Sequence, residues 1–152
     1  MSKISTLHDA IVTKISTNLS SYTQIPNPYL IEEAPQTLLK KGFAVSIGPG
    51  TRTDRLLGCE VSWQRTFTIT LINFVNARDN DTTSRETLIK NFLEDHYTLL
   101  TKFEIDGGLS GTAIDGIVTQ DSGVEYIEID TKPFILTEIE LSVEYIEDLT
   151  AV

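Results

Sequence analysis

The sequence is poor in the residues on which most catalytic and metal sites depend. Its 152 residues include one cysteine, Cys59, and two histidines, His8 and His96. A single cysteine cannot form an intramolecular disulfide, and the metal-ligand spacings Cys-x-x-Cys and His-Glu-x-x-His are missing from the sequence. Carboxylates are numerous, but their spacing gives no indication of the burial that raises a carboxyl pKa for acid catalysis. We therefore predict a protein that is not an enzyme and binds no cofactor or metal.

Long apolar runs and positive charge are also scarce. No apolar run approaches the ~20 residues that cross a bilayer, and the opening Met-Ser-Lys-Ile-Ser-Thr lacks the apolar run of a secretion signal. We expect no membrane-spanning segment, and folding in a cytosol. The 12 Lys and Arg are outnumbered by 22 Asp and Glu, which gives a net charge of −10. Since proteins that grip nucleic acid need clustered Lys and Arg, this balance argues against sequence-specific nucleic-acid binding.

The acidic residues gather near the end of the chain. Residues 121–148 hold nine Asp and Glu and a single base, Lys132. Such a surface repels a polyanion. Two interpretations stay open for it: a solvated face that keeps the protein soluble, and an acidic surface with a function.

Apolar and polar residues alternate over residues 134–147, a pattern typical of a strand with one buried face. Its polar face carries Glu138, Glu140 and Glu144. Residues 124–130 predict a second acidic strand, joined to the first by a short turn. The end of the chain therefore predicts two acidic strands side by side.

The rest of the chain predicts further strands and two main helices. Apolar residues at intervals of three and four indicate the helices, and alternation with abundant threonine indicates the strands. A capping box at Thr83 and Glu86 marks the start of the second helix. The other predicted elements are helices over residues 5–20 and 83–102 and strands over residues 42–47, 60–75 and 114–119. We expect residues 1–152 to form a single α+β domain, a mostly antiparallel twisted sheet packed by two main helices in the order α-β-β-α-β-β.

Glycine and proline predict where these elements are interrupted. Gly48-Pro49-Gly50 is expected to end the strand before it, and Asp121-Ser122-Gly123 to form a turn. Residues 22–36 contain three prolines and no periodicity, so they predict an extended connection. A connection of that length either crosses the surface of its own domain or wraps around a neighbouring subunit.

A mixed basic and apolar segment stands out within the acidic sequence. Residues 51–58 include Arg52, Arg55, Leu56 and Leu57. Arginine beside exposed leucine matches the composition of protein interfaces, so this segment predicts a contact with another protein.

Three segments, together with the order of the elements, resemble a known protein family. They are the strand at residues 43–47 with its glycine-rich break, the strand at residues 65–71, and the closing alternation at residues 138–145. The chain resembles the tail terminator proteins of long-tailed bacteriophages. The resemblance implies a homo-hexameric ring that caps the tail tube, contacts the major tail tube protein and a neck or head-completion protein, and lets DNA pass through. It also implies a location in the virion tail after assembly in the host cytoplasm, and no catalytic residues.

Two hypotheses about sites follow. We expect the mixed segment with Arg52 and Arg55 to contact the tube or a neighbouring subunit. We expect Glu138, Glu140 and Glu144 to line the channel, because carboxylates repel passing DNA.

Two competing functions stay open. Another neck or tail-completion adaptor would share the small α/β build and the charge pattern. A small-molecule-binding domain or hydrolase would need an apolar pocket near His96 and Trp63. We predict that both side chains pack within the fold and that His96 also forms a hydrogen bond.

Overall fold

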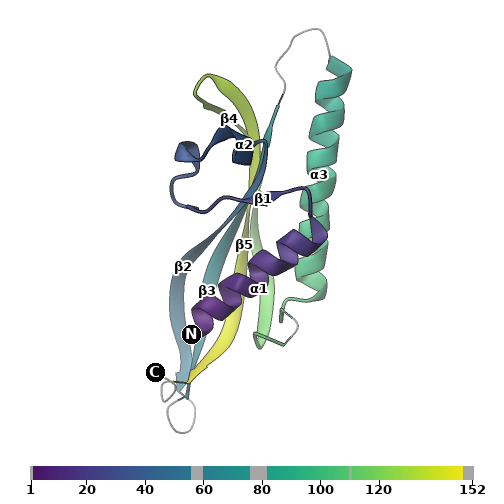
Figure 1. Cartoon of the computed structure of the whole chain (residues 1–152). Helices are drawn as coiled ribbons and strands as arrows, with labels where there is room; N and C mark the ends of the chain where they lie inside the picture. The colour runs from purple at the N-terminus through teal and green to yellow at the C-terminus, as the bar shows by residue number, and fades with distance from the viewer. Residues whose placement is uncertain (1, 56–59, 76–81, 110, 149–152) are drawn as a thin grey trace.

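The computed structural model describes residues 2–55, 60–75, 82–109 and 111–148. In these residues the predicted α+β fold is confirmed: a five-stranded, mostly antiparallel sheet is packed by two main helices (Figure 1). The elements are α1 (Lys3–Asn18), β1 (Thr23–Gln24), the 3-10 helix η1 (Ile31–Glu33), α2 (Gln36–Leu39), β2 (Lys41–Arg55), β3 (Glu60–Phe74), α3 (Thr82–Ile105), β4 (Asp115–Ile129) and β5 (Lys132–Asp148).

The strands lie in the order β1-β2-β3-β5-β4. The pairs β2/β3, β3/β5 and β5/β4 are antiparallel, and the two-residue β1 is parallel to β2. The pairing of β3 with β5 runs without a shift from Glu60 opposite Asp148 to Phe74 opposite Phe134. The closing strand predicted from residues 134–147 therefore lies inside the sheet, between β3 and β4.

Both long helices lie on one face of the sheet, α1 crossing it obliquely and α3 running alongside the strands (Figure 1). The apolar stripe of α1 is completely buried at Leu7, Ile11 and Ile15. The helix begins two residues earlier than predicted, because the side chain of Ser2 accepts a hydrogen bond from the Ser5 amide at 3.2 Å. The main core forms between these helices and the sheet, where each fully buried Leu, Ile or Phe contributes roughly 1.5–3 kcal/mol.

A smaller core covers one end of the opposite face. Here the proline-rich connection, which also carries η1 and α2, places Ile25 and Leu39 against the sheet residues Ile72 and Phe134. Of the two paths proposed for this connection, the structure shows the one across its own domain. The remainder of this face is covered by neither long helix.

The prediction that Gly48-Pro49-Gly50 ends a strand is wrong. β2 continues to Arg55, and the register with β3 shifts between Ile47 and Gly50, as at a β-bulge. A Cβ on Gly48 would lie 2.8 Å from the backbone oxygen of Thr66, so this close approach requires glycine. Residues 51–55 of the mixed segment are therefore part of the strand.

The turn predicted at Asp121-Ser122-Gly123 is also wrong. β4 runs through these residues as one strand of 15, with shifts in register on both sides of Gln120. Chain reversal occurs instead at Asp130 and Thr131, both with positive φ (51° and 66°), as in the two-residue hairpin turns whose twist matches that of the strands.

Candidate functional site

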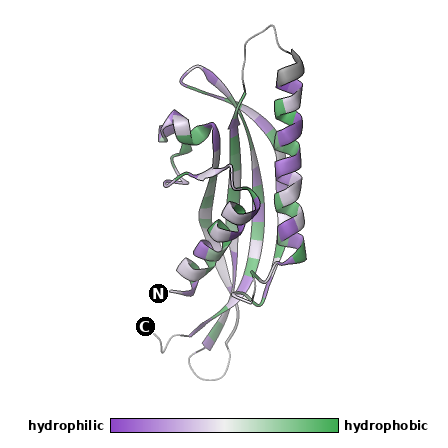
Figure 2. Ribbon diagram, turned by 45° about the vertical axis from the view of Figure 1, so that its right-hand side comes forward, coloured by the Kyte–Doolittle hydropathy of each residue, from purple (hydrophilic) through white to green (hydrophobic). Residues whose placement is uncertain are grey.

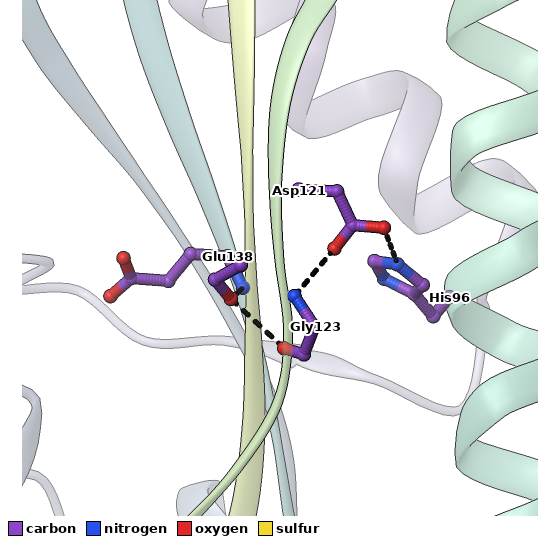
Figure 3. A network of polar contacts seen from close by, with 5 residues as sticks. His96, Asp121, Gly123 and Glu138 are labelled. Atoms are coloured by element: carbon purple, nitrogen blue, oxygen red, sulfur yellow. Dashed lines mark hydrogen bonds and ion pairs between the residues drawn. The ribbon is translucent and has the colours of Figure 1, made fainter.

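The face of the sheet left open by α1 and α3 carries the predicted carboxylates. Along β5, buried Ile139, Leu141 and Val143 alternate with Glu138, Glu140 and Glu144. Because successive strand residues point to opposite faces, all three glutamates lie on the face away from the helices. Figure 3 shows Glu138 extending away from α3, and Figure 2 shows hydrophobic and hydrophilic bands along the strands.

The neighbouring strands extend this surface with polar and acidic groups. Across from β5, the β3 residues are small or amidic: Gln64 faces Glu144, Thr66 faces Ser142, Thr68 faces Glu140, and Thr70 faces Glu138. On the other side, Asp115 of β4 lies directly opposite Glu144. We call Asp115, Glu138, Glu140 and Glu144 the acidic face. Directly opposed like charges destabilise a strand pair by roughly 0.2–1 kcal/mol, so the Asp115–Glu144 pair is not explained by stability.

Positive charge is kept away from the acidic face. Among the residues that the structure describes, none of its four carboxylates forms an ion pair with a Lys or Arg. On the helix-covered side, Arg65 donates from Nε to the Tyr145 hydroxyl at 3.0 Å, and Lys14 of α1 pairs with Asp106 at 3.0 Å. Lys132 occupies an alternate position of β5 on the same face as the glutamates, but it lies at the hairpin tip and donates to Gln36. Within the described part of the chain, the negative charge of the acidic face is therefore not compensated by an ion pair with Lys or Arg.

The structure describes only part of the predicted mixed segment. Arg52 is exposed on β2, where its backbone pairs with that of Trp63. Arg55 closes β2 in register with Val61, and Leu56 and Leu57 lie outside the described residues. The contact proposed for this segment therefore stays a prediction.

His96 joins α3 to the edge of the sheet. The residue is 8% exposed, and its Nε2 lies 2.9 Å from Oδ2 of Asp121 (Figure 3). Partial burial opposes ionisation of Asp121, but hydrogen bonds from His96 and from the Gly123 amide outweigh it and lower the pKa of this carboxyl. The predicted hydrogen-bonded packing histidine is confirmed. Sequence reasoning missed its partner, because Asp121 was assigned to a turn.

The bulge in β4 is fastened to β5 by a side chain. Ser122 Oγ accepts a hydrogen bond from the Glu138 amide at 2.9 Å and donates to the Gly123 carbonyl at 2.9 Å (Figure 3). This pairing satisfies a backbone donor that the bulge would otherwise leave free. The carboxylate of Glu138 is therefore carried by a fixed backbone.

A pocket shared by His96 and Trp63 has no support in the structure. Trp63 packs at the edge of the core, and the Arg65 guanidinium lies over its indole, 6.0 Å from the ring centre. His96 instead contacts Asp121. A cavity of about 490 Å³ lies between α1 and the end of α3, and neither residue lines it.

The described residues offer neither a metal site nor a membrane-spanning helix. No group of three or more His, Cys, Asp or Glu is placed to hold a metal ion there. None of the helices described is both long and apolar enough to span a membrane. Comparison of the sequence with models of protein families and with curated protein sequences finds no match.

The carboxylates of the acidic face repel a polyanion. Sequence reasoning found three of the four carboxylates of the acidic face. It missed Asp115, because only the pairing register places this residue opposite Glu144.

Proposed function

We propose that the protein is a tail terminator of a long-tailed bacteriophage, a structural virion protein that forms a homo-hexameric ring at the end of the tail tube. The ring contacts the major tail tube protein on one side and a neck or head-completion protein on the other. The number of copies and these partners come from the sequence resemblance. The chain would act in the virion tail after assembly in the host cytoplasm.

The acidic face is the observation that carries this proposal. DNA must move through a tail without adhering, and adhesion of DNA comes from Lys and Arg that displace its counterions. A surface with four uncompensated carboxylates and a neighbouring row of hydroxyl and amide groups has no such grip. With both long helices on the other face, six copies can turn this surface inward and keep their helices outside.

The first test is attachment to tubes. Purified protein is mixed with tail tubes built from the phage's major tail tube protein, and tube ends are imaged by electron microscopy. The proposal expects one ring at one end of each tube. Binding to isolated head and neck complexes with bare tube ends would favour the neck adaptor instead.

The second test asks which way the acidic face points. A variant with lysine at positions 138, 140 and 144 is assembled into rings and offered linear and closed circular DNA of equal length. Lysines inside a channel can be reached only by DNA with a free end, so binding to linear DNA is expected to exceed binding to circles. Equal binding to both forms would place these residues on the outer rim.

A matched control carries the same change in charge on the helices, at exposed positions outside the acidic face: Asp9→Lys, Glu86→Lys and Glu94→Lys. Any binding that this variant gains should not distinguish the two forms of DNA. The milder variant with glutamine at positions 138, 140 and 144 should assemble normally and perturb only DNA passage.

A further inference from the structure

The sheet has two different free edges, and their properties are complementary. One edge is β4, which among the described strands pairs with β5 alone. Its amides at Gly116, Val118 and Gly123 already donate to carboxylates of the same chain, so its open part is residues 124–129. The other is the far part of β2, because β1 pairs only with Gly42 and Phe43 and leaves residues 50–55 without a strand beside them in the part of the chain that the structure describes. Unpaired edges of this length are ready templates for another strand.

Charge differs in sign between the two edges. β4 contains four acids and no base: Asp115, Asp121, Glu125 and Glu128. The free part of β2 contains two bases, Arg52 and Arg55, and one acid, Asp54. A β4 edge therefore repels a second β4 edge and attracts a β2 edge.

Exposed apolar side chains lie along the same two edges. On β4, Val124 and Tyr126 are 41% and 62% exposed. Beside them on α3, Leu93 and Tyr97 are exposed on the stripe that continues to Glu104, whose Oε1 accepts a hydrogen bond from the Val118 amide of β4.

The β2 edge carries exposed apolar groups too. Tyr29 and Ile47 are exposed, and the Tyr29 hydroxyl lies 3.3 Å from the Ile47 amide. Large exposed apolar residues along both edges of one sheet are typical of surfaces that contact other proteins.

The directions of the strands also fit. Three antiparallel pairings separate β2 from β4, so the two edge strands run in opposite directions within one copy. When copies are related by rotation about a ring axis, β4 of one copy meets β2 of the next in the antiparallel sense. Because the two edges differ, this contact is heterologous, and such contacts form a ring when the rotation between copies closes.

We infer that the protein assembles by adding the β4 edge of one copy to the β2 edge of the next. The occupant of each free edge is a second copy of this chain, and the acidic faces of neighbouring copies then form one continuous surface. This inference rests on the proposed function for the closed ring, and on the charges and strand directions for the pairing.

The test uses two variants, each blocked at one edge. The first, Val124→Lys with Tyr126→Lys, adds charge to the exposed apolar part of β4. The second, Arg52→Glu with Arg55→Glu, reverses the charge of β2. Masses are measured by light scattering across a concentration series, and circular dichroism verifies that each variant is folded.

Native protein is expected to form a closed species of several copies, and each variant alone to stay a monomer. An equimolar mixture of the two variants should form a two-chain complex and nothing larger, because only one intact edge of each kind remains. The control Ile105→Lys, an exposed apolar position at the end of α3, should assemble as the native protein does.

The inference is overturned if native protein is a monomer at every concentration, if either variant assembles normally, or if the mixture gives no two-chain complex. These results are distinguishable from failure of the proposed function. Rings that form through these edges and ignore tail tubes would refute the function alone, while tube-bound rings unaffected by both variants would refute the edge pairing alone.

Discussion

Alternate residues of β5 divide the molecule into two faces of opposite character. Ile139, Leu141 and Val143 are completely buried under the helices, whereas Glu138, Glu140 and Glu144, at the alternate positions, lie on the face away from α1 and α3. Neighbours in one strand thus belong to different surfaces. The comparison teaches that stability is concentrated on the helix-covered face, which leaves the acidic face free to serve another purpose at little cost to the fold.

The largest loss of stability should come from truncating a buried side chain on the helix-covered face. Phe67 is fully buried opposite Leu141, so Phe67→Ala should lower the free energy of unfolding by about 3–5 kcal/mol. Its neighbour Thr66 lies on the opposite face, and Thr66→Ala should cost less than about 1 kcal/mol. Urea unfolding of both variants measures the difference. Equal losses of unfolding free energy would show that the two faces do not differ in their contribution to stability.

A smaller loss is expected where a polar pair links α3 to β4. Asp121→Ala removes the partner of His96 Nε2, while His96 Nδ1 is buried without a hydrogen-bond partner among the described residues. We expect a loss of roughly 1–3 kcal/mol by the same urea measurement. Asp115→Asn on the open face of the same strand is the matched control and should show no such loss.

The same carboxyl should make stability depend on pH. Because the pKa of Asp121 is lowered on folding, its contribution is complete above the unfolded pKa of about 3.9 and disappears as pH falls through the lower folded value. Unfolding measured between about pH 5 and pH 2 should therefore show a decline that is shallower in Asp121→Asn. If stability declines with pH equally steeply in both proteins, the Asp121–His96 pair does not stabilise the fold.

The smallest effect should have the opposite sign. Glu144 lies opposite Asp115 with no base beside it, so Glu144→Gln should raise the free energy of unfolding by a few tenths of a kcal/mol. Glu94→Gln on the exposed side of α3 serves as the control for the loss of one charge. A clear loss of stability in Glu144→Gln would show that the acidic face contributes to folding.

Much of this comparison was predictable from the sequence. A period of two in residues 134–147 predicts which side chains are buried, since hydrophobic burial selects the face of a strand. The same reasoning found both long helices through their apolar stripes. These signals are local, so they persist without any knowledge of the neighbouring strands.

Features that depend on pairing between strands could not be predicted. Gly48-Pro49-Gly50 and Asp121-Ser122-Gly123 have the composition of turns, and only the register with β3 and β5 shows that each is a bulge in a longer strand. Asp115 joins the acidic face for the same reason. The proline-rich connection has no periodicity, so its packing against Ile72 and Phe134 left no signal in the sequence.

The most direct measurement of the central claim is a cryo-electron microscopy map of the protein bound at the end of a tail tube. The account predicts six copies in one ring, with Glu138, Glu140 and Glu144 of every copy facing the channel and α1 and α3 on the outside. A map with these carboxylates on the outer rim, or no ring at the tube end, would contradict it.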